Sequence, residues 1–392
     1  MSDRRFSSLA LKFGLLALLV LTSLGLSYRV GRRSRLHDLQ QATQEAIRRS
    51  DPDASSASAR AAAELTPAVT DDWKAIAGLY QAKRDYRKMA DALGQVPATD
   101  PQFITISLLR ADILFSELEQ AKEAERIWLD VLERDPSSAQ AWQRLIYVYA
   151  VTLRRTDMMR AIRRAALLKR EPREAYAYAT AMMGLTFSDG LVRTLGWTKR
   201  DPDDESLQVA RAIYLASAAR RTTTDLFPDT PWQPGSLEPL KECRERYPRN
   251  IELLCYLLES AVQEGDVDQA RALLEGVEAP ADEARIISYR AWVLATDRKF
   301  AEADEAFARA VAINPLDWRT RHQWASVLRT LGQKAKSSHE AAIGIQGKAL
   351  ERRILALPTA ADADEELMRE VARYFADCGE SELRTALQAR LE

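Results

Sequence analysis

Histidine and clustered carboxylates are the residues of this 392-residue chain whose types could support acid–base catalysis or metal binding. The three histidines, His37, His322 and His339, pair with no nucleophile in a known motif, and none has the i, i+4 spacing of a helical metal site. The acidic runs DPDDE at 201–205 and DADEE at 362–366 precede expected helices, where carboxylates favour the N-terminal dipole. We therefore expect no catalytic residue, no metal site and no cofactor.

Patterns that bind nucleotides or activate a nucleophile are also missing from the sequence. It contains no GxGxxG, Walker A, GxSxG or HExxH motif. The three cysteines, Cys243, Cys255 and Cys378, lack CxxC spacing, which argues against structural zinc and against a disulfide scaffold. A catalytic domain over residues 171–250 is the alternative, but that stretch contains no histidine. The sequence therefore indicates a protein that is not an enzyme.

Composition narrows the fold class. The chain is 46% hydrophobic and 29% charged, and its 15 glycines and 15 prolines are few for this length. Collagen-like, disordered and all-β classes are therefore excluded, and a helical fold is favoured. Residues 1–50 contain nine basic and three acidic residues, whereas the rest of the chain is mildly acidic. This distribution favours contact between the basic N-terminal segment and a membrane surface. The acidic remainder lacks the positive charge expected of a nucleic-acid-binding protein.

The N-terminal segment has the length and composition of a membrane span. The twenty residues from Leu9 to Tyr28 are uncharged except for Lys12, and as a helix they would cross a hydrocarbon core of roughly 30 Å. We predict a transmembrane helix over about 9–28. It lies within residues 1–33, which we predict to form an anchor at the cytosol and membrane. A juxtamembrane helix and linker are expected to follow over residues 34–67.

Flanking charges predict the orientation of this helix. Two arginines precede it and four follow it: Arg4 and Arg5, then Arg29, Arg32, Arg33 and Arg35. The positive-inside rule therefore favours a single-pass protein of the bacterial inner membrane with its large C-terminal part in the cytoplasm, and a periplasmic location is the alternative. Small residues at Ser23 and Gly25 also permit a cleaved signal peptide, which would leave an exported periplasmic peptide-binding solenoid.

Internal repeats organise the rest of the chain, residues 68–392. The clearest unit, 284–317, combines small, large and helix-ending residues at fixed positions: Ala291, Phe300, Ala303, Phe307, Ala310 and Pro315. Small residues let two antiparallel helices approach, large ones fill the space between them, and proline ends the second helix. Units that start at 105 and 139, and at 251, 284 and 318, are 34, 33 and 34 residues apart.

This pattern resembles the tetratricopeptide repeat (TPR) family, in its membrane-anchored bacterial type. The resemblance implies an all-α fold, in which the N-terminal transmembrane helix precedes a right-handed α-solenoid of helix-turn-helix repeats over 68–392. The match is weakest over 171–250, which contains an insertion at 222–235. The resemblance also implies capping helices over 364–392.

The TPR resemblance also implies a binding surface, because the first helices of successive repeats line a concave groove in this family. Carried onto the best-matching units, the groove residues are Gln140, Gln143, Tyr147, Arg285, Ser288, Trp292, Arg319, His322, Ser326 and Arg329. Arginines around Trp292 suit a protein or peptide ligand with an apolar anchor and an acidic segment or C-terminal carboxylate. In the insertion, Phe227 and Trp232 either pack against the solenoid or form a second partner contact.

The function implied by the resemblance is a membrane-tethered protein–protein interaction scaffold or adaptor. Such proteins serve envelope assembly, secretion or quality control of membrane enzymes. A non-catalytic subunit of a membrane enzyme complex is an alternative. The anchor and the GRRS that follows it at 31–34 are similar to the start of lipopolysaccharide-assembly regulators, but the metal-binding cysteine cluster of those proteins is absent here.

Overall fold

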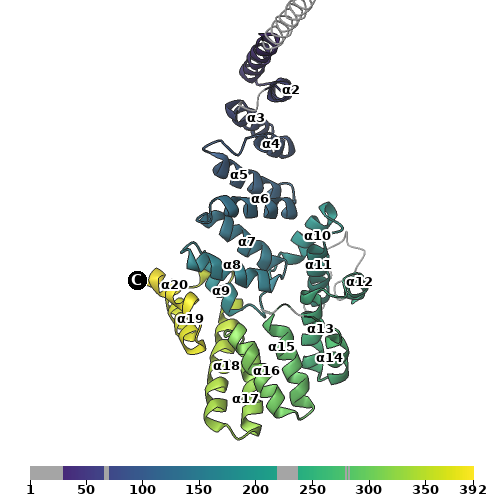
Figure 1. Cartoon of the computed structure of the whole chain (residues 1–392), viewed down its shortest axis with the longest axis vertical. Coiled ribbons are helices and arrows are strands. Elements are labelled where there is room, and N and C mark those ends of the chain that lie inside the picture. The colour runs from purple at the N-terminus through teal and green to yellow at the C-terminus, as the bar shows by residue number, and fades with distance from the viewer. Residues whose placement is uncertain (1–29, 66–69, 219–236, 279, 281–282) are drawn as a thin grey trace, which may run out of the picture. The chain divides into compact units, whose positions relative to one another are not determined.

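The computed structural model describes residues 30–65, 70–218, 237–278, 280 and 283–392 (Figure 1). Within these ranges all regular structure is helical and no strand occurs, as the all-α prediction requires. None of the helices described there is long and apolar enough to cross a bilayer. The predicted transmembrane helix at 9–28 and the insertion at 222–235 lie outside the described residues. The chain divides into two compact units, Met1–Leu118 and Glu119–Glu392.

The first unit consists of consecutive helices that each pack on the next. They are a helix over residues 30–48, then α2 (Pro52–Ala63), α3 (Thr70–Ala82), α4 (Tyr86–Leu93) and α5 (Phe103–Ser116). Small residues allow a close approach between the first two, since Ala59 and Ala62 are fully buried and Thr43 Oγ1 donates a hydrogen bond to Ser58 Oγ at 2.9 Å. Tyr80 ties α3 to α2 because its hydroxyl donates to the carbonyl of Pro52 at 3.0 Å.

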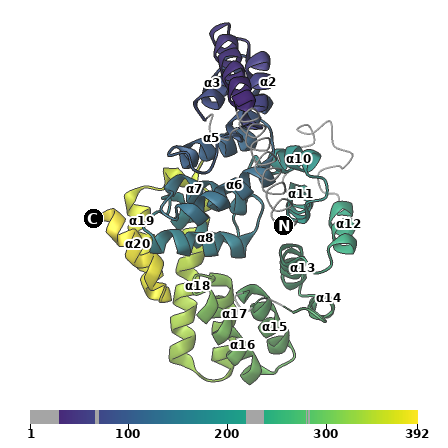
Figure 2. The same cartoon turned by 45° about the horizontal axis from the view of Figure 1, so that its top comes forward.

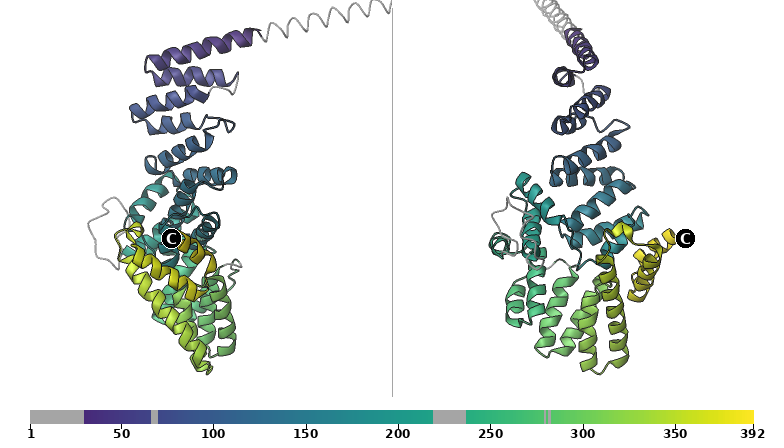
Figure 3. Two further views of the ribbon diagram at one scale, coloured as in Figure 1. Left: turned by 90° about the vertical axis from the view of Figure 1, so that its left-hand side faces the viewer. Right: turned by 180° about the vertical axis from the view of Figure 1, so that it is seen from behind.

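The second unit holds most of the repeats. Its helices are α6 (Ala121–Arg134), α7 (Ala139–Val151), α8 (Arg155–Leu167), α9 (Glu174–Thr180), α10 (Gly190–Arg200), α11 (Glu205–Ala218), α12 (Glu238–Arg246), α13 (Ile251–Glu264), α14 (Val267–Leu274), α15 (Ala284–Thr296), α16 (Phe300–Ile313), α17 (Trp318–Thr330), α18 (Lys334–Leu355), the short 3₁₀ helix η1 (Ala360–Asp362), α19 (Glu365–Cys378) and α20 (Ser381–Leu391). Neighbours pack as antiparallel pairs, most extensively α15 with α16 and α17 with α18 (Figure 3).

The predicted repeat starts coincide with observed helix starts. Helices α7, α13, α15 and α17 begin at the first residues of the units predicted at 139, 251, 284 and 318. A side chain caps each start: Ser138, Asn250, Glu283 and Asp317 accept hydrogen bonds from backbone N–H groups of the first turn. Local sequence therefore fixes where each repeat begins, and the prediction of helix-turn-helix units is confirmed for these repeats.

The predicted packing between α15 and α16 is also confirmed. Ala291, Ala303 and Phe307 are fully buried, and Ala310 is nearly so. Ala291, Ala303 and Phe307 belong to a hydrophobic cluster that reaches Trp324 and Leu328 of α17. The small residues allow the helix axes to approach while Phe307 fills the space between the helices, as the TPR pattern predicts.

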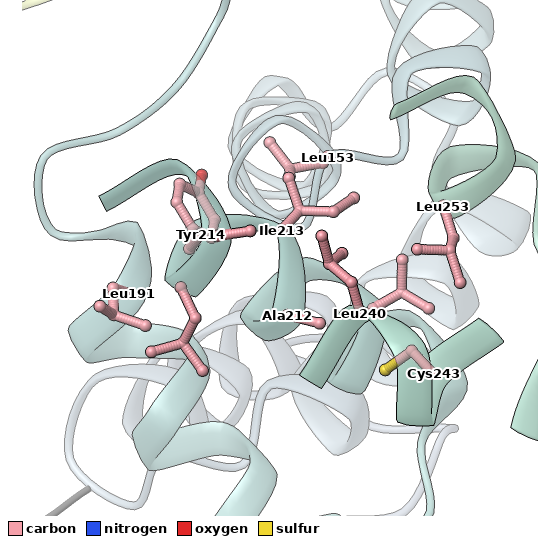
Figure 4. Close-up of a cluster of buried hydrophobic side chains, with 11 residues drawn as sticks. Leu153, Leu191, Ala212, Ile213, Tyr214, Leu240, Cys243 and Leu253 are labelled. Carbon is pink, nitrogen blue, oxygen red and sulfur yellow. The ribbon is translucent and has the colours of Figure 1, made fainter. Parts of the chain in front are cut away.

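The degenerate middle of the chain is helical but less regular. Helix α9 is short, and α10, α11 and α12 pack around a separate apolar cluster that includes Leu191, Ile213 and Leu240 (Figure 4). At the start of α10, Gly190 lies against the Tyr214 ring so closely that any Cβ would overlap it. The hydroxyl of Tyr214 donates to the carbonyl of Val151 at 3.0 Å, so this cluster is anchored on the end of α7.

The C-terminal helices of the second unit return to α8 and α9. Helix α20 packs on α8 (Figure 2), and both α18 and α19 pack on α9. Arg163 forms an ion pair with Glu380 at 2.9 Å, and Arg390 forms one with Glu171 at 3.2 Å. The arc from α9 to α20 therefore closes on itself, whereas an open solenoid would contact only successive neighbours. The repeat pattern could not predict this closure because the paired residues are more than 200 positions apart.

Candidate functional site

The predicted groove residues of α15 and α17 fall into two environments. Arg285, Ser288 and Arg319 lie toward the N-terminal ends of these helices. Trp292, His322, Ser326 and Arg329 lie toward the middle and the C-terminal ends. The two sets share one face, since Arg285 and Trp292 are seven residues, or about two turns, apart.

Arg285 is buried, with 3% of its surface exposed, and carboxylates occupy both sides of its guanidinium. Its Nε and Nη2 donate to the Glu283 carboxylate, each at 2.7 Å. Its Nη1 and Nη2 donate to the Glu252 carboxylate at 2.6 and 2.9 Å. The prediction that Arg285 contacts a partner is thus corrected: this side chain is buried and holds α13 and α15 together through two carboxylates of the same chain.

Helix α8 covers this ion network. The backbone N–H of Arg155 donates to Glu252 Oε1 at 3.0 Å, and Thr156 Oγ1 donates to Glu283 Oε2 at 2.6 Å. Burial alone would raise the pKa of Glu283, but the charge and hydrogen bonds of Arg285, with the Thr156 hydroxyl, hold it below its ordinary value. The N-terminal end of the expected groove is therefore filled by another part of the same chain.

Ser288 and Arg319 are also engaged within the fold. Ser288 is buried and shares a 2.7 Å hydrogen bond with Thr320 of α17. Arg319 binds Glu351 of α18 at 3.1 Å and lies 3.8 Å from the Glu259 carboxylate of α13. The prediction that Ser288 contacts a ligand is corrected because its side chain is buried, whereas Arg319 is partly exposed and its charge is already paired with Glu351.

Toward the C-terminal ends of the helices, the structure leaves a cavity of about 360 Å³. Its lining comes from three helices: Trp292, Ala295 and Thr296 of α15, Phe300 and Phe307 of α16, and His322, Gln323, Ser326, Val327 and Thr330 of α17. The predicted groove residues Trp292, His322 and Ser326 thus line one hollow. We call it the Trp292 cavity.

Trp292 is half-buried and packs against two hydrophobic clusters, one shared with α13 and α14 and one shared with α16 and α17. Its position between repeats gives the cavity an apolar wall that is already ordered. Sequence reasoning did not single out Thr296, Val327 and Thr330 as lining residues. The signal was present, because Thr296 and Thr330 follow Trp292 and Ser326 by one helical turn.

The predicted groove residues of α7 have different neighbours. Gln143 Nε2 lies 3.5 Å from Glu174 Oε1 of α9, and the Tyr147 ring meets Phe187 edge-on at 5.6 Å between centroids. Gln140 is exposed at the start of α7. None of the three lines the Trp292 cavity. The predicted insertion contacts Phe227 and Trp232 lie outside the described residues.

A second cavity, of about 390 Å³, was not anticipated from the sequence. It lies where the N-terminal ends of α8, α11, α13 and α15 meet, and it is lined mainly by polar side chains. Each charged residue that lines it already has a partner, as in the pairs Lys122 with Asp204 at 3.5 Å and Arg154 with Asp157 at 2.9 Å. Every charged side chain that lines this cavity is therefore already paired within the fold, and none is free to bind a charged ligand.

Nothing in the described part of the chain assembles reactive groups. No set of three His, Cys, Asp or Glu side chains there could hold a metal ion. The three cysteines are buried and unpaired, and burial raises the pKa of each thiol, that of Cys378 to about 12. Thiolate chemistry is disfavoured at these positions because the anion would be desolvated.

Comparison with known proteins gives structural likeness only. No family model and no curated protein matches the chain. Among solved structures it is similar to a tetratricopeptide repeat protein from Parabacteroides merdae, with 12% identity over 75% of this chain and 99% of that one and a TM-score of 0.29. Yeast Tom70 is 12% identical over 92% of this chain and 95% of that one, with a TM-score of 0.27. Human IFIT1, as a dimer with PPP-AAAA, is 13% identical over 80% of this chain and 71% of that one, with a TM-score of 0.32.

The TPR-like fold is argued from the helix pairs of this chain, which start at the predicted positions and bury the predicted small and large residues. The described chain is a set of TPR-like helix pairs, and the Trp292 cavity is a preformed hollow with an apolar wall between two of them.

Proposed function

We propose that this protein is a membrane-tethered scaffold of the TPR type that binds a protein partner by accepting one of its apolar side chains in the Trp292 cavity. TPR-like folds generally serve as protein–protein interaction scaffolds. The observation that carries the proposal is the cavity itself, because it joins side chains from two successive repeats around a half-buried tryptophan. Large aromatic residues in preformed pockets are the usual centres of binding energy at protein interfaces.

The proposal assigns no catalytic step to the chain. The cavity supplies shape and apolar surface, and its only titratable lining residue is the exposed His322. Because the helices that form the cavity are packed before the partner arrives, little ordering entropy is lost on binding.

Site-specific photocrosslinking tests the proposed docking site. In cells that express the full-length protein, Ser326→p-benzoylphenylalanine is expected to capture a partner, and adding Trp292→Ala is expected to abolish the adduct. The matched control is Arg309→p-benzoylphenylalanine, since Arg309 is exposed on the face of α16 opposite Phe300 and Phe307. Equal adducts at both positions, or adducts that survive Trp292→Ala, would overturn the proposal. If Phe227→Ser/Trp232→Ser abolishes the adduct and Trp292→Ala does not, the partner contacts the insertion instead of the cavity.

Membrane tethering is the second part of the proposal and depends on the apolar segment at 9–28 and the arginines that follow it. The intact mass of the membrane-extracted protein separates an uncleaved anchor from a chain that starts near Leu26. Protease treatment of spheroplasts then locates the repeats, which we expect to be protected on the cytoplasmic side. Digestion from outside would instead favour the exported solenoid.

A further inference from the structure

The rim of the Trp292 cavity carries positive charge that the fold does not neutralise. Arg298 and Lys299 form the turn between Thr296 and Phe300, two residues that line the cavity. Arg329 lies one turn after Ser326 on the same face of α17. All three side chains are exposed, and no ion pair joins any of them to another residue that the structure describes.

Acidic residues near the cavity are, by contrast, already engaged. Asp297 pairs with Arg271 at 2.9 Å. Asp304 accepts hydrogen bonds from Trp324 Nε1 at 2.7 Å and from Gln333 Nε2 at 3.2 Å. The remaining acids of α16, at 302 and 305, lie on the face opposite Phe300 and Phe307 by helical periodicity. The free charge at the mouth of the cavity is therefore positive.

Helix dipoles account for only part of this charge. Arg329 occupies the last turn of α17, where the helix dipole favours a cation. Lys299 is the N-cap of α16, where the dipole disfavours a cation and Ser, Thr, Asp or Asn would cap the helix better. Arg298 directly follows the C-cap of α15, where the dipole of that helix favours a cation, so Lys299 is the rim cation that its helix disfavours.

From this juxtaposition we infer that the Trp292 cavity binds an acidic protein segment, in which a large apolar residue enters the cavity and Asp or Glu residues within a few positions of it face Arg298, Lys299 and Arg329. This inference rests on the proposed function and names the chemistry of its partner. It also relocates the basic contacts: the sequence pointed to Arg285, Arg319 and Arg329, and only Arg329 remains available. Exposed charges at the rim mainly set specificity and association rate, while the apolar anchor supplies most of the affinity.

Selection from a random library of displayed twelve-residue peptides tests the inference. With the purified full-length protein as bait and the Trp292→Ala variant as counter-bait, enriched peptides should combine an aromatic or large aliphatic residue with at least two nearby acidic residues. Enrichment of neutral or basic flanks, or no enrichment, would overturn the inference. If the enriched peptides are neutral but still require Trp292, the proposed function stands and only the inference fails. If the peptides bind without Trp292 and crosslinks at Ser326 are absent, both the inference and the proposed function fail.

A matched pair of charge variants tests the rim itself. In Arg298→Ser/Lys299→Ser/Arg329→Ser, fluorescence anisotropy of the best labelled peptide should show binding weakened about tenfold at low salt, and the difference should shrink in 0.5 M salt. The control Arg309→Ser/Arg352→Ser removes two exposed arginines away from the cavity lining, so binding should stay within about twofold of the wild type. Equal losses in the two variants would show that the rim charges do not contact the peptide.

Discussion

The predicted groove face of helices α15 and α17 is covered at the N-terminal ends of the helices and open at their C-terminal ends. Near the N-terminal ends, Arg285 and Glu283 are buried, and α8 contacts both Glu283 and the partly buried Glu252. Near the C-terminal ends, Trp292 and Ser326 line an open apolar hollow. Both sets occupy positions that line the groove in the TPR family. The difference shows that a repeat position determines which way a side chain points, whereas only the tertiary structure determines what covers it.

Helix α8 is the physical reason for this difference. A single stripe on α8, formed by Arg155, Thr156, Met159 and Arg163, meets the N-terminal ends of later helices and the loop before α17. The stripe ends at Glu380, the N-cap of α20. No equivalent helix covers the C-terminal ends of α15 and α17 in the described part of the chain. The groove is therefore closed along one edge and open along the other.

The largest effect is expected at the closed end. Arg285→Ala leaves the buried Glu283 and the partly buried Glu252 without their main cation, so the free energy of unfolding should fall by about 3–5 kcal/mol. Urea unfolding of the purified protein followed by tryptophan fluorescence measures this loss. Arg309→Ala, at an exposed position of α16, should change stability by about 0.5 kcal/mol or less. A comparable loss in both variants would contradict the assigned role of the network.

At the open end the same kind of truncation should affect binding more than folding. Trp292→Ala removes the wall of the cavity, and partner affinity should fall by about 2 kcal/mol or more, roughly thirtyfold. A crosslink-competition titration against the wild type measures the loss, with Trp292→Phe as a control that keeps an aromatic wall. If Trp292→Ala destabilised the protein as much as Arg285→Ala and left affinity unchanged, the two ends would not differ as described.

Much of the fold could be predicted from the sequence because repeat signals are local. Small residues such as Ala291 and Ala303, the caps at Ser138 and Asn250, and the spacing of 33 or 34 residues each act within one helix pair. The small residues and the starts of these repeats lie where they were expected, and the structure adds the caps. The closure of the arc could not be predicted, since the pairing of Arg163 with Glu380 joins residues that no periodicity relates.

The candidate site shows the same limit. Trp292, His322 and Ser326 were placed on one surface by their repeat positions, and the structure brings them together. Arg285 occupied an equivalent position, yet its environment depends on Glu252 and on Thr156, which is 129 residues away. A single sequence gives no signal for that contact. The identity of the rim cations likewise required knowing that Thr296 and Phe300 both face the hollow.

A smaller effect should appear as pH dependence at the closed end. Because the pKa of Glu283 in the folded state lies below its ordinary value of 4.5, the unfolded chain binds more protons near that pH and stability rises with pH. This contribution to stability is complete above about pH 5 and is lost as the pH falls through the lower pKa of the folded state. In Glu283→Gln this component is absent, so the stability difference from the wild type should shrink between about pH 6 and pH 3. Urea midpoints across that range measure it, and a constant difference would contradict the role of Glu283.

The smallest effect is expected where the arc closes on α8. Arg163 and Glu380 form a partly buried pair, so Arg163→Glu or Glu380→Arg alone should cost about 1 kcal/mol and increase hydrogen exchange in both α8 and α20. The double exchange Arg163→Glu/Glu380→Arg restores opposite charges and should recover most of the loss. In an open solenoid, a change at residue 380 would leave exchange in α8 untouched, because coupling passes only between neighbouring repeats. Exchange that rises in α20 but not in α8 would therefore show that the arc is open in solution, and the contrast between its covered and uncovered edges would then have to come from α13 and α15 alone.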